Sequence, residues 1–243
     1  MKTEIEQLKR KLVKKFHQAT ATYRLLEDGD RILVGLSGGK DSLLLLELLA
    51  GQARIHRPRF EVMAMHIRMS NVRYETDTEY LERFAANLGV RLYVETTGFQ
   101  DRNDGNKKPV CFLCSWYRRK MLFNKAQELG CNKIALGHHL DDIIHTSLMN
   151  IFFQGQFASM PARLKMRRMP LTIIRPLCYE DECDILRYAQ LAGYEKQVKL
   201  CPYETASHRE DVKRIFRQVE EMNTEARHSI LNALESAGKM TEE

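Results

Sequence analysis

Residues 31–50 read Arg31-Ile-Leu-Val-Gly-Leu-Ser-Gly-Gly-Lys-Asp-Ser-Leu-Leu-Leu-Leu-Glu-Leu-Leu-Ala50. The apolar run from Ile32 to Leu36 has the length of a buried strand, and the leucine-rich run that begins at residue 43 predicts a buried helix. The hexapeptide between them, Ser37-Gly-Gly-Lys-Asp-Ser42, begins with turn-forming residues and ends with residues that favour a helix start. The stretch therefore predicts a strand, a tight glycine loop and a helix N-terminus in direct succession.

The predicted loop has the features of a phosphate-binding site. Backbone N–H groups at a helix N-terminus and the helix dipole attract an anion, and Gly38 and Gly39 allow a close approach of the backbone. The loop is not a Walker A motif, because its glycines are spaced one residue too closely and an aspartate replaces the Ser or Thr. An ordinary turn between a strand and a helix, whose glycines only permit a tight corner, is the alternative.

The polar side chains of the loop suit a bound metal nucleotide. We expect Lys40 to pair with a phosphate and the Ser42 hydroxyl to donate a hydrogen bond to it. A carboxylate beside a phosphate is repulsive unless a divalent cation lies between them, so Asp41 is expected to hold Mg²⁺.

The rest of the chain predicts an α/β fold with a doubly wound parallel sheet and helical extensions at both ends, because short strands alternate with helices. Ligands of such sheets bind at the carboxyl ends of the strands. His66, near one such end, is expected to touch adenine or, alternatively, to be a core histidine with satisfied hydrogen bonds. The sequence divides into a basic helix over residues 1–26, an α/β domain over residues 27–205, and a C-terminal helix and tail over residues 206–243.

Further strands are predicted at residues 60–67, 90–95, 134–137 and 171–176, and further helices at 77–88, 115–129, 143–153, 180–191 and 208–237. The glycine-, methionine- and base-rich residues 155–168 are expected to form a loop.

Composition limits the classes of function. The chain has 243 residues, of which 44% are hydrophobic, so it can bury a sizeable core. Its net charge of +6 favours a polyanionic partner. No apolar stretch reaches the roughly 18 residues of a membrane span, and no apolar signal segment follows the N-terminus, so we expect a cytoplasmic protein without a membrane partner.

Six cysteines without a secretory signal indicate metal or catalytic use more than a disulfide framework. Cys111 and Cys114 form a Cys-x-x-Cys pair, which is typical of metal, cluster and redox sites. With Cys201 as a third ligand and no evident fourth, the set suits a 4Fe-4S cluster with one open iron. Zinc completed by a histidine or water, or an inert pair, are the alternatives. Cys131, Cys178 and Cys183 are interpreted as buried structural residues.

Three motifs in this order resemble the tRNA 2-thiocytidine synthetase family of the PP-loop N-type ATP pyrophosphatase superfamily. The first is Ser37–Ser42. The second is Cys111-Phe-Leu-Cys-Ser-Trp-Tyr-Arg-Arg119, and the third is Gly137-His-His-Leu-Asp-Asp-Ile143. The resemblance covers about residues 15–205.

The resemblance implies an enzyme that splits ATP to AMP and pyrophosphate while it adenylates a cytidine of the tRNA anticodon loop. The base is then thiolated with sulfur carried on the open iron of a cluster held by Cys111, Cys114 and Cys201. It also implies a homodimer and a sulfur donor such as a cysteine desulfurase. The remaining residues with implied roles are those near the nucleotide, Gly137, His138 and Asp142, and those that hold Mg²⁺ together with Asp41, namely Asp141 or Asp142.

Basic residues near these motifs are candidates for binding RNA phosphates, although solvated surface charge is expected for about half of them. They are Arg118, Arg119, Lys120, Arg163, Lys165, Arg167 and Arg168. Trp116 is expected to pack in the core more than to stack on a base.

Other functions fit parts of the pattern. A lysidine synthetase or an amidating ligase needs the phosphate loop without three cysteines. A thiol oxidoreductase needs only the cysteine pair, and a zinc-bearing RNA-binding module needs no ATP turnover. A different RNA base or a small-molecule acceptor is also open.

Overall fold

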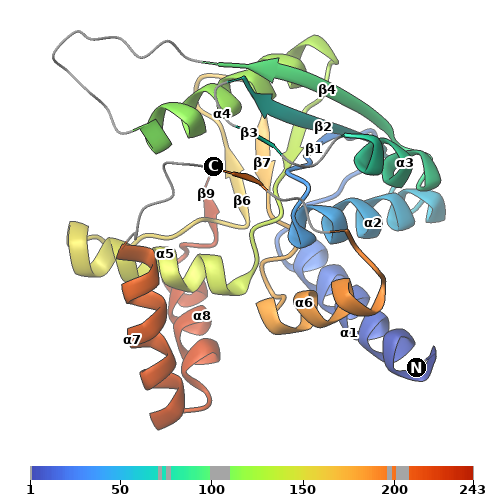
Figure 1. Ribbon diagram of the computed structural model, residues 1–243. Helices are drawn as coiled ribbons and strands as arrows, with labels where there is room; N and C mark the ends of the chain where they lie inside the picture. Colours follow the sequence, from blue (N-terminus) through green and yellow to red (C-terminus); the bar gives the residue numbers. More distant parts are fainter. Residues whose placement is uncertain are drawn as a thin grey trace, which may run out of the picture. The chain divides into compact units, whose positions relative to one another are not determined.

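The structure, a computed structural model, describes residues 2–70, 73–74, 78–98, 110–195, 199–200 and 208–242. The chain divides into two compact units, whose elements are labelled in Figure 1. We call Leu26–Leu136 with Ala189–Glu204 the loop unit, because it contains the predicted phosphate loop. We call Met1–Leu25, Gly137–Tyr188 and Thr205–Glu243 the helical unit. The division at residues 26 and 205 made from the sequence stays a prediction.

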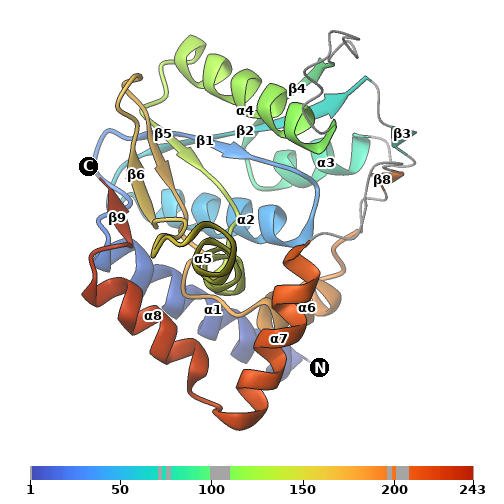
Figure 2. The same cartoon turned by 90° about the vertical axis from the view of Figure 1, so that its left-hand side faces the viewer.

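The loop unit is built on parallel strands in the order β4, β2, β1, β5. Its elements are β1 (Arg31–Gly35), α2 (Lys40–Ile55), β2 (Glu61–Met69), β3 (Arg73–Tyr74), α3 (Glu79–Asn87), β4 (Arg91–Thr97), α4 (Val110–Glu128), β5 (Lys133–Ala135) and β8 (Lys199–Leu200). Figure 2 shows α4 on one face of these strands and α2 on the other. The predicted doubly wound parallel sheet is therefore confirmed.

The core of the loop unit explains the two apolar runs that flank the loop. Ile32, Leu33 and Val34 of β1 are fully buried, as expected for a central parallel strand that is covered on both faces. In α2, residues 42–50 are buried except for Glu47, which is partly exposed. Both elements that carry the loop are thus anchored in the core.

The helical unit packs helices from both ends of the chain around its middle segment. Its elements are α1 (Lys2–Thr22), α5 (Leu140–Gln154), β6 (Arg163–Lys165), β7 (Thr172–Ile174), α6 (Glu182–Leu191, of which residues 189–191 belong to the loop unit), α7 (His208–Met222), α8 (Ala226–Ser236) and β9 (Thr241–Glu242). Strand β6 is antiparallel to β7 and parallel to β9. Helix α5 packs against α7 and α8, and these two helices also contact each other. Buried Val212 and Phe216 of α7 and Leu234 of α8 supply part of this core.

Two predictions about the C-terminal half are wrong. The segment 155–168, predicted as a loop, contains β6, because residues 163–165 pair with β7 in a register that joins Arg163 to Ile174. The single helix predicted over residues 208–237 is interrupted after Met222. Asn223 causes this break, since its side chain accepts a hydrogen bond from the Glu225 N–H at 3.0 Å, which favours a turn over a continued helix.

No helix in the described part of the chain is both long and apolar enough to cross a membrane. Helix α2 is apolar, but it has only 16 residues, fewer than the roughly 20 that span a bilayer. Helix α1 has 21 residues, but lysines and arginines interrupt its sequence throughout.

The packing of α2 predicts unequal effects of two substitutions in the same helix. Leu46 is fully buried, whereas 59% of the Ile55 side chain is exposed. Leu46→Ala is expected to lower the free energy of unfolding by about 2–5 kcal/mol, because it removes buried methyl groups and leaves a cavity. Ile55→Ala, the matched control, is expected to change it by less than about 0.5 kcal/mol. Urea denaturation followed by circular dichroism measures both values, and equal losses would contradict this packing.

Candidate functional site

The loop between β1 and α2 has the geometry expected of a phosphate cradle. Gly38 has φ of 82°, in the left-handed region that favours glycine. Gly39 is the N-cap of α2 and, as a glycine, has no side chain that could cap the first N–H groups of the helix. The Ser42 hydroxyl donates to the Gly39 carbonyl at 2.9 Å and lies 3.2 Å from the Ser37 hydroxyl. The serines therefore hold the loop closed, and the N-terminus of a 16-residue helix faces the position that a bound anion would take.

Lys40 and Asp41 occupy the first positions of α2 and contact each other. The Lys40 Nζ lies 3.0 Å from Asp41 Oδ1, and the two side chains are 22% and 28% exposed. The Lys40 ammonium and the Asp41 carboxylate thus form an ion pair at the N-terminus of α2, and both are partly exposed to solvent. This is the arrangement that a phosphate with a bound divalent cation requires, since each of its charges meets an opposite charge.

His66 lies beneath the loop. Its side chain is 2% exposed, and its Nδ1 lies 2.8 Å from the carbonyl oxygen of Leu36, the residue that follows β1. The Leu36 N–H in turn donates to the carbonyl of Met65 in β2 at 2.8 Å. The interpretation of His66 as a core histidine with satisfied hydrogen bonds is confirmed, and its contact with adenine stays a prediction. The His66 ring thus holds Leu36, the residue at which the loop begins.

Cys111 and Cys114 lie in the first turns of α4, which begins at Val110 and not at Ser115 as predicted. The Ser115 hydroxyl donates to the Cys111 carbonyl at 2.9 Å, a bond that keeps the serine compatible with the helix. Residues three apart face the same side of a helix. Cys111 is exposed, Cys114 is partly exposed, and neither forms a disulfide.

These two thiols fit a cluster or metal site, because thiolates are the ligands of iron–sulfur clusters and both are reachable at one helix end. Cys201 lies outside the described residues, directly after β8 in the sequence. The described part of the chain contains no group of three or more His, Cys, Asp or Glu side chains placed to hold a metal ion. A complete three-cysteine site therefore stays a prediction.

The other cysteines differ from one another. Cys131 and Cys178 are buried, and burial raises the pKa of both thiols, which makes them poor nucleophiles and ligands. Their structural interpretation agrees with this environment. Cys183 is exposed on α6, so the expectation that it is buried is wrong.

The surface of α4 after the cysteines is aromatic and basic. Trp116, predicted to pack in the core, is 44% exposed. It meets Tyr117 edge to face, with ring centroids 4.9 Å apart, and the Lys120 Nζ lies 5.2 Å from its centroid. Arg119 and Lys120 are exposed, whereas Arg118 is only partly exposed. The prediction for Trp116 failed because the inner face of α4 is formed instead by residues such as Leu122 and Ala126.

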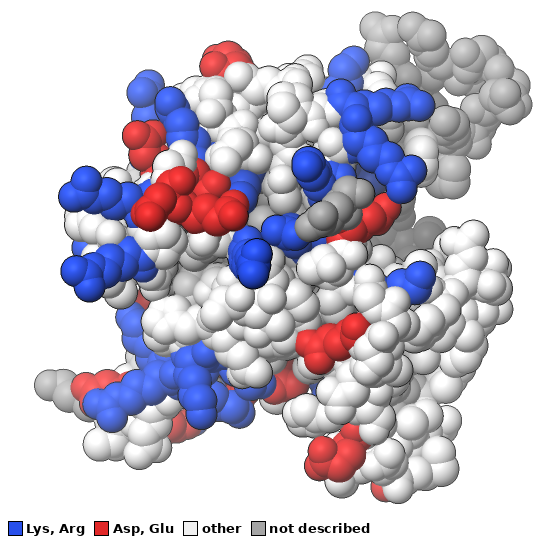
Figure 3. All heavy atoms as spheres, turned by 180° about the vertical axis from the view of Figure 1, so that it is seen from behind, with Lys and Arg blue, Asp and Glu red and all other residues white. Residues whose placement is uncertain are grey.

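The other predicted basic residues lie on or after β6. Lys165, Arg167 and Arg168 are exposed and Arg163 is partly exposed. Arg167 lies 3.6 Å from Glu242, in a pair that is open to solvent. On the face drawn in Figure 3, many Lys and Arg side chains likewise have Asp or Glu side chains beside them. Net charge therefore does not by itself mark an RNA surface.

In the helical unit, Gly137–Asp142 leads into α5. His139 is the N-cap, and its backbone N–H donates to Asp142 Oδ2 at 3.3 Å. Asp142 Oδ1 accepts from the Arg209 guanidinium of α7 at 3.2 Å. Helix α5 begins at Leu140, three residues before the start at residue 143 that the sequence predicted.

His138 is held by Arg175, whose Nε donates to His138 Nδ1 at 3.3 Å. Burial and the neighbouring Arg175 charge lower the pKa of His138 to about 4. The imidazole is therefore neutral at neutral pH, and because Nδ1 accepts, Nε2 carries the proton. Arg175 also donates to the carbonyl of Pro161, which connects residues 138, 161 and 175.

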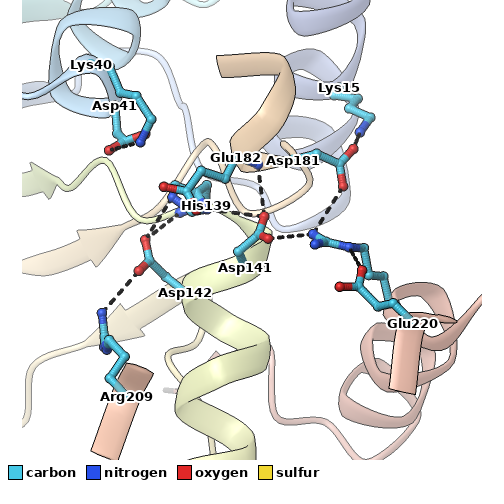
Figure 4. A network of polar contacts seen from close by, with 11 residues as sticks. Lys15, Lys40, Asp41, His139, Asp141, Asp142, Asp181, Glu182, Arg209 and Glu220 are labelled. Carbon is cyan, nitrogen blue, oxygen red and sulfur yellow. Dashed lines mark hydrogen bonds and ion pairs between the residues drawn. The ribbon is translucent and has the colours of Figure 1, made fainter. Parts of the chain in front are cut away.

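Asp141 is the centre of the polar network drawn in Figure 4. Its Oδ2 accepts from the Glu182 N–H at 2.9 Å, and its Oδ1 accepts from the Arg227 guanidinium at 2.6 Å. His139 Nδ1 lies 3.6 Å from Oδ2. Burial alone would raise the pKa of Asp141, but the contacts with His139, the Glu182 N–H and Arg227 together hold it well below its usual range. The carboxylate is therefore ionised and fully engaged.

Sequence reasoning missed three charged groups in this region: Arg209, Arg227 and Glu180. Asp141 and Arg227 are 86 residues apart, and no local pattern links a carboxylate to a guanidinium at that separation. Glu180 is fully buried, and neither of its carboxyl oxygens has a hydrogen-bond partner among the described residues. Its main-chain carbonyl accepts from the Leu140 N–H at 3.0 Å, which ties it to the start of α5.

Known proteins with similar sequences were found for most of the chain. The profile of a family described as PP-loop domain matches residues 5–197. A tRNA-cytidine(32) 2-sulfurtransferase of Syntrophotalea carbinolica is 36% identical over 234 residues, which cover 94% of this chain and 90% of that protein. The protein of the same name from Bordetella avium is 36% identical over 223 residues, 90% of this chain and 69% of that protein.

The structure also resembles a solved one. The U34-tRNA thiolase NcsA from Methanococcus maripaludis, determined with its 4Fe-4S cluster, superposes with a TM-score of 0.76 at 23% identity. The match covers 96% of this chain and 79% of the thiolase. At this identity the likeness shows a shared fold.

The buried Glu180 predicts a pH-dependent stability. Burial is the main cause that raises its pKa to about 8; the charges of Asp181 and Asp184 add to this rise, and those of Lys11 and Lys15 oppose it. An exposed glutamate has a pKa of about 4.3, so between these values the folded state binds more protons than the unfolded chain, and stability falls as the pH rises. Glu180→Gln is expected to unfold like the parent protein at pH 5 and to be about 1–3 kcal/mol more stable at pH 8.

Urea denaturation at the two pH values measures this difference. Glu210→Gln, the same change at an exposed position of α7, is the control and is expected to behave like the parent at both. If Glu180→Gln is no more stable than the parent at pH 8, the ionised Glu180 carboxylate does not destabilise the folded state, and the prediction is wrong.

Proposed function

This chain belongs to the PP-loop family and, within it, to the tRNA 2-thiocytidine synthetases, and we propose that it is a tRNA sulfurtransferase that uses ATP to form 2-thiocytidine in the anticodon loop. One observation supports the proposal most strongly: the loop unit contains both a phosphate cradle, at the start of α2, and two thiols that are at least partly exposed to solvent, at the start of α4. A phosphate cradle alone fits many ligases, and a thiol pair alone fits many redox proteins.

The loop residues bind and orient ATP in this proposal. Backbone N–H groups at the start of α2 and the Lys40 ammonium hold the phosphates, and Ser37 and Ser42 shape the loop. Asp41 holds Mg²⁺, which neutralises phosphate charge as pyrophosphate departs. Gly137, His138 and Asp142 are proposed to contact the nucleotide, with the neutral His138 Nε2–H as a hydrogen-bond donor. The contribution of these groups is positioning and electrostatic stabilisation.

The reaction needs activation because the cytosine O2 oxygen is a poor leaving group. In the first step O2 attacks the α-phosphorus of ATP and pyrophosphate leaves, which gives an O-adenylated base. In the second step a sulfur nucleophile adds at C2, and AMP leaves with the original oxygen. The target base must be unstacked to expose C2, as bases of a single-stranded loop are.

Cys111, Cys114 and Cys201 would hold the 4Fe-4S cluster, the first two from one face of α4. When bound, a cluster with three protein ligands has one iron open to carry the sulfur that is transferred. The exposed position of Cys111 gives a large substrate access to this end of α4.

The exposed Arg119 and Lys120 follow the thiols on α4 and are proposed to bind tRNA phosphates. Arg118, Arg163, Lys165, Arg167 and Arg168 are weaker candidates, since the first two are partly covered and Arg167 has an acidic neighbour. A homodimer in the cytoplasm, supplied with sulfur by a cysteine desulfurase, completes the proposal.

Asp41 tests the activation step. Asp41→Ala is expected to lower tRNA-dependent pyrophosphate release from ATP by at least about 100-fold, the usual scale for losing transition-state charge stabilisation. Its thermal unfolding is expected to change little, because the side chain is partly exposed and lies outside the core. Asp211→Ala, at an exposed position of α7, removes the same group as a control. Unchanged pyrophosphate release in Asp41→Ala would rule out this loop as the site of activation.

The cysteines test the sulfur step. Protein purified without oxygen is expected to contain about four iron and four acid-labile sulfide atoms per chain. Cys201→Ser is expected to lose iron and 2-thiocytidine formation while it retains ATP binding, whereas Cys183→Ser, at an exposed cysteine of α6, retains all three. Zinc in place of iron would contradict the three-cysteine cluster and favour a persulfide-based thiolase or an amidating ligase. Thiolation by Cys201→Ser would also contradict the cluster and favour a persulfide-based thiolase.

A further inference from the structure

The C-terminal helices supply two guanidinium groups to the start of α5. Arg209 of α7 contacts Asp142 at 3.2 Å, and Arg227 of α8 contacts Asp141 at 2.6 Å. Both arginines lie beyond residue 197, where the match to the PP-loop family ends. The segment that carries His138 is therefore supported by a part of the chain that the family match does not include.

The Asp141 carboxylate is occupied by contacts from the protein. Its side chain is 7% exposed, with Arg227 on Oδ1 and the Glu182 N–H and His139 on Oδ2. Magnesium requires near-octahedral coordination at about 2.1 Å and usually retains several waters. A divalent cation on Asp141 would have to displace these donors from a buried group and lie beside the positive charge of Arg227.

Arg227 is itself held on several sides. It pairs with Glu220 of α7, its Nη1 lies 3.8 Å from Asp181 Oδ1, and its guanidinium lies 5.9 Å from the Phe216 ring centroid. Asp181 also pairs with Lys15 of α1 at 2.5 Å. The guanidinium is thus fixed between Glu220 of α7 and Asp181, the residue before α6, and it donates to Asp141.

We propose that Arg227 is a positioning residue that fixes Asp141 as the structural anchor of the nucleotide segment His138–Asp142, and that Asp141 is not a magnesium ligand. The proposal rests on the proposed function for the role of this segment in ATP binding. Through Oδ2 the anchor joins α5 to the Glu182 N–H at the start of α6, and the Leu140 N–H joins α5 to the carbonyl of Glu180, two residues before α6. The position of His138 next to this anchor then depends on helix α8.

The dependence of nucleotide binding on Mg²⁺ concentration distinguishes the two possible roles of Asp141, structural anchor and magnesium ligand. Titrations of a non-hydrolysable ATP analogue at a series of Mg²⁺ concentrations compare Asp141→Asn, Arg227→Met and the double variant. Each single change is expected to weaken analogue binding by about tenfold through misplacement of the segment. The double variant is expected to be no more than about twofold worse than either, because both changes remove the same contact.

The Mg²⁺ concentration that gives half of the maximal binding is expected to stay within about twofold of the parent value in all three variants, because none of them removes a metal ligand. A large increase in that concentration for Asp141→Asn, with Arg227→Met unchanged, would make Asp141 a magnesium ligand and overturn the proposal. Unchanged analogue affinity in both single variants would overturn the positioning role.

Two further variants keep the test interpretable. Arg227→Lys retains the charge and is expected to bind the analogue within about threefold of the parent, so it reports on the contact even if Arg227→Met folds poorly. Arg187→Met breaks an exposed pair with Glu4 in the same unit and is expected to leave binding unchanged. If the parent protein does not bind the analogue, the proposed function fails. The anchor is then tested by thermal unfolding, where non-additive losses in the double variant support it and additive losses overturn it.

Discussion

The short connection between β1 and α2 is the constraint on which the loop unit depends. Leu36–Gly39 must connect β1, whose central residues are fully buried, to α2, whose residues 42–50 are buried except for Glu47, within a few residues. His66 and Met65 of the neighbouring strand hold Leu36 at the point of departure. Gly38 then takes a backbone conformation that other residues rarely adopt. The free N–H groups of α2 are a consequence of this path, and so is their use for an anion.

The helical unit solves a different problem, because it buries charges. Asp141, Arg175 and Glu180 are all nearly or fully inaccessible to solvent. Asp141 has donors on both oxygens and stays ionised, whereas Glu180 has none among the described residues and is protonated until about pH 8. Partners therefore decide the charge of each carboxyl group more than burial does. The outcome is a rigid start of α5 with a neutral His138 beside it.

The features that could be predicted from sequence alone are those that depend on local sequence patterns. The apolar runs around Ser37–Ser42 and the alternation of strands and helices determined the parallel sheet, and the order of three motifs indicated the family. Contacts between distant residues were not predictable in this way. The pairing of β6 with β7 depends on a partner strand, and the exposure of Trp116 depends on which face of α4 meets the sheet. Arg227 carries no local sign that it will meet Asp141.

The phosphate loop and the thiol pair are assigned to two successive steps on one base, so the two steps must be coupled. The most direct measurement is the amount of pyrophosphate and of 2-thiocytidine formed in the same anaerobic reaction with tRNA, ATP and a sulfur source, the nucleoside being identified by mass spectrometry. The account predicts equal amounts of the two products and neither of them without tRNA. Formation of 2-thiocytidine without ATP, or pyrophosphate release with a modified base that contains no sulfur, would contradict it.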